Sequence, residues 1–91
     1  MELSDVPTLP RGVRLHHDRV RDAWVLLAPE RAITLDPIGQ AILEEVDGTR
    51  TFGDITTALA EKYNAPAKQI REDSAGFLTA LKHRRFLDVA G

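Results

Sequence analysis

The three histidines are the residues of this chain whose chemistry first suggests a metal site. His16 and His17 are adjacent in a stretch that alternates like a β-strand, so their side chains point to opposite faces and cannot chelate one ion. His83 stands far from them in the sequence. A zinc site needs several ligands around one point, and the chain has no cysteine to complete such a set. We therefore interpret the histidines as ordinary surface or half-buried residues and expect no metal.

Two pairs of neighbouring carboxylates, at residues 44–45 and 72–73, are the remaining candidates for acid–base chemistry. Both pairs fall in stretches with helical periodicity, where adjacent side chains do not face each other. Ser4 and Ser74 have no evident base beside them, and no glycine-rich phosphate loop is present. No catalytic constellation can be assembled from these residues. We expect a protein that is not an enzyme and holds no cofactor.

The charge of the chain argues against a nucleic-acid or membrane partner. Its 91 residues form one domain with a formal net charge of −2, which gives no basic footprint. The only basic cluster, Lys-His-Arg-Arg at residues 82–85, is typical of a helix C-terminus, where cations complement the helix dipole. No signal peptide or apolar run of membrane-spanning length is visible. We expect a cytoplasmic protein.

The stretch at residues 24–35, WVLLAPERAITL, organises the rest of the chain. Its first run, residues 24–28, is apolar on both alternating faces and suits a central strand. Its second run, residues 31–35, has one apolar face and suits an edge strand beside the first. Trp24 is interpreted as core, with a half-exposed platform for a partner as the alternative.

Three strands followed by three helices form the predicted architecture, an α+β domain. Residues 1–12 are read as an extended or poorly ordered segment, and residues 13–91 as the single domain, with a first strand over 13–17. Asp36 and Pro37 predict a helix start, and the pair at residues 47–48 predicts its end. A second helix runs from Thr51 to the break at residues 64–66, and a third from Ala67 to about Arg84. Residues 86–87 are expected to fold back as an anchor and residues 90–91 to fray.

Two helix faces are predicted to be buried. Periodicity assigns Ile38, Ala41, Ile42 and Val46 to the first helix's inner face, and Phe52, Ile55, Leu59 and Tyr63 to the second's.

The predicted edge strand has two interpretations. Arg31 is the only residue in it that could discourage pairing with another chain. Either the N-terminal segment covers the edge, or an extended peptide adds a strand there, with the third helix supplying a pocket wall.

Several motifs then occur in one order along the chain: Leu-Leu-Ala-Pro-Glu-Arg at 26–31, Leu-Asp-Pro-Ile-Gly at 35–39, Ile-Leu at 42–43, Val-Asp-Gly-Thr-Arg-Thr at 46–51, Ile55, Leu-Ala at 59–60, Tyr63 and Asp-Ser-Ala-Gly-Phe-Leu-Thr-Ala-Leu at 73–81. This ordered set resembles the PqqD family over nearly the whole chain, from Pro10 to Leu87. The Leu-Asp-x-x-Gly, Ile-Leu and Asp-Gly core by itself indicates only the broader superfamily of RiPP recognition elements.

The resemblance implies a winged-helix-like peptide chaperone of pyrroloquinoline quinone (PQQ) biosynthesis. Members of that family bind a ribosomally made precursor peptide and present it to a radical SAM enzyme, which cross-links a Glu and a Tyr of the peptide. In the wider superfamily the leader segment pairs with the third strand and lies against the third helix.

Carried onto this sequence, the resemblance implies a set of peptide-binding residues on the edge strand and the third helix: Arg31, Ala32, Ile33, Thr34, Leu35, Ile70, Arg71, Ser74, Phe77, Leu78 and Leu81. Some of the helix residues must belong to the core. Charge suggests Lys68, Arg71 and Lys82 as partners of acidic side chains in the peptide.

Two other functions stay open. A small winged-helix DNA-binding domain is disfavoured by the acidic charge, and would show a steep salt dependence. An interaction domain that forms a homodimer through its edge, by exchange of strands or of the N-terminal segment, would self-associate and ignore a precursor peptide.

Overall fold

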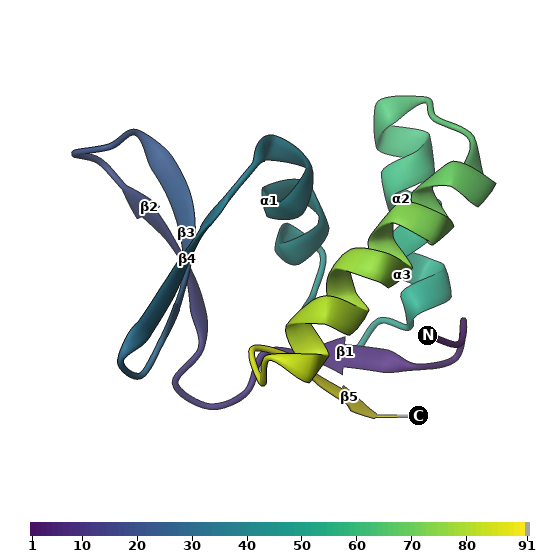
Figure 1. The fold of residues 1–91 in the computed structure, drawn as a ribbon. Helices are drawn as coiled ribbons and strands as arrows, with labels where there is room; N and C mark the ends of the chain where they lie inside the picture. Colours follow the sequence, from purple (N-terminus) through teal and green to yellow (C-terminus); the bar gives the residue numbers. More distant parts are fainter. Residues whose placement is uncertain (91) are drawn as a thin grey trace.

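A computed structural model describes residues 1–90 of the chain and confirms an α+β domain with a three-stranded antiparallel sheet and three helices (Figure 1). The strands β2, β3 and β4 form one layer, and α1 lies between this sheet and the pair α2–α3. The elements in chain order are β1 (Val6–Thr8), β2 (Arg14–Asp18), β3 (Ala23–Ala28), β4 (Arg31–Leu35), α1 (Pro37–Glu44), α2 (Phe52–Tyr63), α3 (Ala67–His83) and β5 (Asp88–Ala90).

The three-stranded sheet has the order β2-β3-β4, so the apolar β3 is central as the sequence predicts. Leu26 of β3 is fully buried and lies opposite Ile33 of β4. Between the two strands, Glu30 takes a positive φ of 61°, which closes a turn of only two residues. The bounds of β4 agree with the predicted run at residues 31–35.

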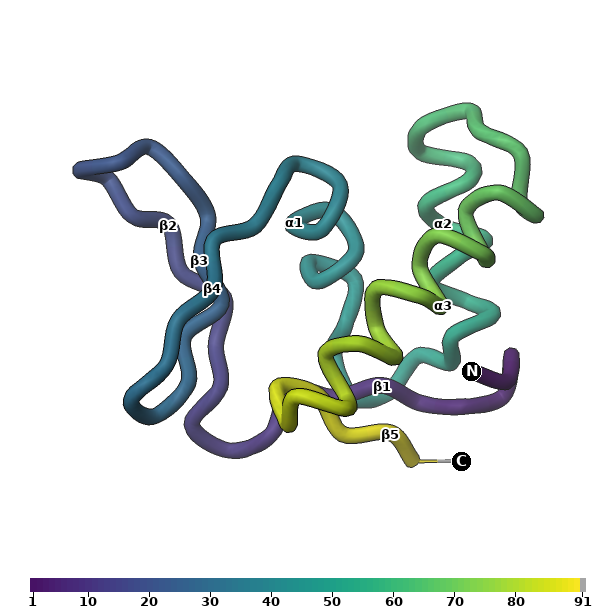
Figure 2. Tube along the Cα trace, viewed as in Figure 1, coloured from purple at the N-terminus to yellow at the C-terminus, as the bar shows by residue number. Residues whose placement is uncertain are grey.

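A second sheet, formed by β1 and β5, was not predicted. Val6 pairs with Ala90 and Thr8 with Asp88, so the N-terminal segment is held against the end of the chain (Figure 2). The same segment also accepts hydrogen bonds from the start of α2, where Phe52 N–H donates to the Asp5 carbonyl at 2.7 Å. Of the two alternatives given for residues 1–12, extended or poorly ordered, this strand fits the extended one. The predicted fraying is wrong for Ala90, and Gly91 lies outside the described residues.

The start of α1 follows the prediction, but its end does not. Asp36 is the N-cap, accepting a hydrogen bond from Gly39 N–H at 2.7 Å, and Pro37 opens the helix. The helix stops at Glu44, before residues 47–48, because the Asp47 carboxylate accepts hydrogen bonds from the backbone of the next residues and builds a turn instead. Ile38 is 67% exposed, so its predicted place on the buried face is wrong.

The helix α2 has the predicted capping box. Thr51 Oγ1 accepts from Asp54 N–H, while the Asp54 carboxylate accepts from Thr51 N–H. Asn64 ends the helix in the left-handed region with a φ of 50°. Tyr63 is 53% exposed and is not part of the buried face that periodicity assigned to it.

The core lies between the inner face of the sheet and the three helices. It is completed by Phe86 and Leu87, both essentially fully buried, which confirms the predicted anchor after α3. The buried side chains that form one cluster are Leu26, Leu35, Ile42, Leu43, Phe52, Ile55, Leu59, Leu78, Leu81, Phe86 and Leu87.

The turn between α1 and α2 should make stability depend on pH. Hydrogen bonds to the Asp47 carboxylate, first from Arg50 N–H and then from Thr49, hold the pKa of this carboxyl well below its usual range. A lowered pKa in the folded state stabilises the fold above the usual aspartate pKa of about 4 and loses this contribution as the pH falls. Asp47→Asn should therefore lower Tm at pH 7, and the difference from the parent should shrink in acid.

Thermal melts of both proteins at pH 7 and near pH 3 would check this expectation. Asp88→Asn, at an exposed position on β5, is the matched control and should leave Tm nearly unchanged at both pH values. A Tm difference for Asp47→Asn that is equal at both pH values would show that the charge of Asp47 is not responsible.

Candidate functional site

The outer edge of β4 is open in the described part of the chain, where β4 pairs with β3 alone. Ala28 and Arg31 flank the two-residue turn, and such a pair is hydrogen-bonded in a tight hairpin. Because hydrogen-bonded and non-bonded pairs alternate along antiparallel strands, every second residue from Arg31 bonds towards β3. The N–H groups of Ala32 and Thr34 consequently point away from β3, to the open edge. The N-terminal segment does not pair with this edge, because its strand β1 pairs with β5.

A groove of about 440 Å³ runs between β4 and the C-terminal half of α3. The apolar face of β4 forms one wall, with Leu35 buried and Ile33 half-buried, while Ala32 and Thr34 are exposed. The structure thus places the edge strand beside the third helix, as the interpretation of this edge as a peptide site requires. The residues that line the groove are Ile33, Thr34, Leu35, Asp36, Phe77, Ala80, Leu81 and Arg84.

The α3 residues that were candidates for peptide contact divide into four groups. Phe77 and Leu81 line the groove beside β4. Leu78 is fully buried in the core and does not line the groove. Ile70 and Ser74 lie along a different hollow nearer the start of α3, and Arg71 is exposed outside both hollows. Helical periodicity identifies the inner face of α3, but only the C-terminal half of that face lies beside β4.

Three groove residues were missed by sequence reasoning. Asp36 was assigned to helix capping alone, although it also stands at the end of the groove. Ala80 and Arg84 continue the helical face of Phe77 at intervals of three and four residues, which is the signal that could have found them.

A second, apolar hollow of about 360 Å³ lies among the three helices. The exposed side chains of Ile38 and Tyr63 both line it, which accounts for their absence from the core. Gly39 lies against the ring of Phe77: a Cβ at this position would lie 3.0 Å from Cζ of Phe77, so this glycine allows the ring its position in the groove. The residues that line this second hollow are Pro37, Ile38, Ala41, Ile42, Leu59, Tyr63, Ile70, Asp73 and Ser74.

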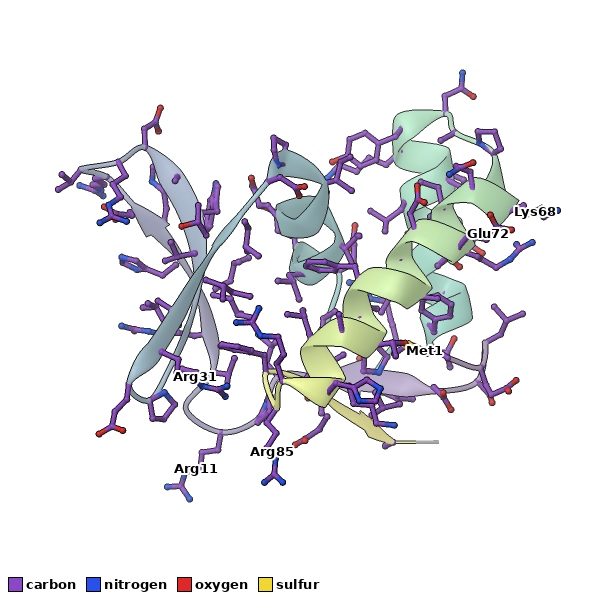
Figure 3. The ribbon with its side chains drawn as sticks, in the orientation of Figure 1. Met1, Arg11, Arg31, Lys68, Glu72 and Arg85 are labelled. Atoms are coloured by element: carbon purple, nitrogen blue, oxygen red, sulfur yellow. The ribbon has the colours of Figure 1, made fainter. Side chains whose placement is uncertain are left out.

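The lysines suggested as partners of an acidic peptide do not line the groove. Lys82 faces a hollow on another side of α3, together with Met1 and Asp5. Lys68 stands at the opposite end of α3 from the part of the groove that Arg31 borders (Figure 3). The cationic side chains beside the groove are instead Arg31 and Arg84.

The histidines do not belong to a cluster of metal-ligand side chains in the described residues. His17 Nε2 lies 3.2 Å from an Asp22 carboxylate oxygen, and its ring is tilted against that of Trp24 at 5.1 Å between centroids. Trp24 is half-buried and packs against the core. Across residues 1–90 no three side chains of the His, Cys, Asp or Glu type gather around a point where a metal ion would fit.

Membrane insertion through a helix is not supported either. Within the same residues, every helix is too short or too polar to cross a lipid bilayer.

The fold and the groove together define a class of protein: a small winged-helix-like domain with an open sheet edge beside a long helix, a geometry suited to binding an extended peptide by strand addition. Residues 23–87 match the family model described as Coenzyme PQQ synthesis protein D (PqqD). The chain belongs to the PqqD family.

Relatives and solved structures agree with this assignment. A protein of Rhizobium meliloti named "PqqA binding protein" is 48% identical over 86 residues, which cover 94% of this chain and 88% of that protein. The solution NMR structure of the PqqD truncation of Methylobacterium extorquens PqqCD, described as a functional, stand-alone RiPP recognition element, matches with a TM-score of 0.82 and 45% identity, covering 96% of this chain and 93% of that one. TbiB1, solved in complex with the TbiA(beta) leader peptide, shares the fold, with a TM-score of 0.75, 23% identity and coverage of 89% and 94%.

Proposed function

We propose that this chain binds the ribosomally made precursor peptide of PQQ by strand addition along β4. The observation that carries the proposal is the open edge, where the outward N–H groups of Ala32 and Thr34 stand beside an apolar groove. Backbone pairing at the edge would hold the peptide extended, and the groove would receive alternate side chains. The relatives' name, PqqA binding protein, supports the PQQ precursor as the peptide.

We infer that the bound peptide is then presented to the radical SAM enzyme that cross-links its Glu and Tyr. The chain itself supplies no catalytic group; it acts in the cytoplasm, where the peptide is synthesised, by raising the peptide's effective concentration at the enzyme. Ordering a flexible peptide costs about 1–2 kcal/mol per fixed backbone residue, so edge pairing and the apolar groove must outweigh that cost. We propose that residues 13–91 form the peptide-binding domain, with residues 1–12 as an extended segment beside it. The enzyme docks on a different surface.

Filling the groove tests this function. Ala80 is exposed and lines the groove, so Ala80→Trp places a large ring where the peptide must lie. We expect titration calorimetry with the precursor peptide to show a loss of affinity on the order of 10-fold or more, equivalent to about 1.4 kcal/mol. The matched control is Lys82→Trp, an exposed position on the same helix that faces away from the groove, and it should retain the parent affinity.

Equal peptide affinities of Ala80→Trp and Lys82→Trp would show that the groove is not part of the binding site.

The rival functions give different results in the same experiments. A homodimer through β4 would show self-association that rises with protein concentration. Added peptide would not reduce this self-association. A DNA-binding domain would bind duplex DNA with a steep salt dependence and show no heat with the peptide.

A further inference from the structure

Two arginines lie where β4 begins and α3 ends: Arg84 lines the groove, and Arg31 contacts Arg84. Arg31 Nη1 donates a hydrogen bond to the Arg84 carbonyl at 2.9 Å, which fixes the start of β4 to the end of α3. The guanidinium carbons of Arg31 and Arg84 lie 4.3 Å and 5.3 Å from the centroid of the Phe86 ring. Phe86 is fully buried, so a rigid part of the core holds both cations beside one ring.

Neither arginine is neutralised by a carboxylate in the described residues. The ion pairs found there join His17 to Asp22, Arg21 to Asp18, and Arg50 to Glu45 and Asp47. Arg31 uses one of its five N–H donors on the carbonyl of Arg84, the residue that caps the C-terminus of α3, where a cation also complements the helix dipole. The other donors of Arg31, and the whole guanidinium of Arg84, which lines the groove, are left for a ligand.

The other end of the groove has the opposite charge. There Asp36 follows β4 directly and lines the groove while capping α1. A peptide lying along β4 therefore meets cations at one end and a carboxylate at the other. Such a charge gradient favours one placement of a peptide whose own charges are unevenly distributed.

We propose that Arg31 and Arg84 bind a carboxylate of the bound peptide and thereby set which stretch of the peptide lies on β4. This inference rests on the proposed function. Guanidinium groups suit carboxylates because their N–H donors are arranged in a planar fork. The carboxylate belongs to an Asp or Glu side chain or to the C-terminus of the peptide, and the apolar groove beside it receives the neighbouring side chains.

Arg84→Gln tests the proposal without disturbing the strand, because its exposed side chain holds no backbone group of β4 in place. We expect this variant to bind the Glu/Tyr-containing precursor peptide about 5-fold to 10-fold more weakly at low salt, with the difference shrinking as salt is added. Arg85→Gln is the matched control, since the neighbouring Arg85 lines a hollow away from the groove, and it should bind as the parent does.

Altered peptides identify the carboxylate. Versions with each Asp or Glu changed singly to Asn or Gln, and one with an amidated C-terminus, would be titrated into the parent and into Arg84→Gln. One of them should weaken binding to the parent and make no difference to Arg84→Gln. Equal affinity of Arg84→Gln, Arg85→Gln and the parent, or a loss with no peptide carboxylate coupled to Arg84, would overturn the proposal. Failure of the parent to bind any of the peptides would instead overturn the proposed function.

Discussion

Thr34→Pro should lower the affinity for the precursor peptide on the order of 100-fold while the domain stays folded. Thr34 is exposed, and its N–H points to the open edge of β4 instead of towards β3. Proline removes this donor, and its ring occupies the path of an added strand. Because its N–H is not used within the sheet, an edge residue of this kind tolerates proline better than one that bonds to β3. The loss corresponds to about 2–3 kcal/mol, the cost of an unsatisfied peptide acceptor together with steric exclusion.

Thr34→Ala is the matched control for this variant. It removes the side chain at the same position but keeps the backbone N–H, so the peptide should bind it within about 2-fold of the parent. Titration calorimetry would give both affinities, and a two-dimensional amide NMR spectrum would show whether each variant is folded. Full binding by a folded Thr34→Pro variant would exclude strand addition at this edge.

Leu78→Ala should destabilise the domain by about 2–5 kcal/mol and leave the peptide-binding surface unchanged. Leu78 is 0% exposed and packs in the cluster that joins the sheet to the helices, so its removal leaves a cavity. That loss is a large part of the roughly 5–15 kcal/mol that holds a domain of this kind together. Urea unfolding, followed by the fluorescence of Trp24, would measure it.

The groove variant Ala80→Trp gives the opposite pattern on the same helix, with affinity lost and the urea midpoint retained. Peptide affinity of Leu78→Ala, measured where the variant is fully folded, should match that of the parent. Parent-like stability together with weakened binding would show that Leu78 contacts the peptide, as the resemblance to the PqqD family implied.

Local chemistry made the site-forming elements of this fold predictable. The run at residues 31–35 is bounded by a two-residue turn and a strong helix cap, so the bounds of β4 could be taken from the sequence alone. The capping box at Thr51 and the left-handed Asn64 defined α2 in the same way. Each of these signals depends on residues a few positions apart.

The second sheet, which sequence reasoning missed, depends on residues far apart. The strands β1 and β5 are three residues long, too short to show a period, and one of them contains Pro7. Their pairing joins the two ends of the chain, which no local pattern reports. The end of α1 was misplaced because an Asx turn at Asp47 competes with the helix, although Gly48 does adopt the left-handed backbone expected after a helix.

The division of α3 into core and groove shows the same limit at the candidate site. Periodicity places Ile70, Phe77, Leu78 and Leu81 on one face. Only the folded structure, which places β4 beside the C-terminal half of the helix, shows that Phe77 and Leu81 line the groove while Ile70 and Ser74 line another hollow. The arginine pair likewise joins positions 31 and 84, which only the folded chain brings together.

Amide hydrogen exchange by NMR, with and without the precursor peptide, tests strand addition most directly. The N–H groups of Ala32 and Thr34 point to the open edge, so they should exchange rapidly in the free protein and become protected when the peptide adds a strand. Their neighbour Ile33 already bonds to β3 and should change little. Protection confined to Ala32 and Thr34 on β4, with chemical shift changes at Phe77, Ala80 and Arg84, is the predicted result. Tight binding of the peptide with no new protection at Ala32 and Thr34 would contradict it.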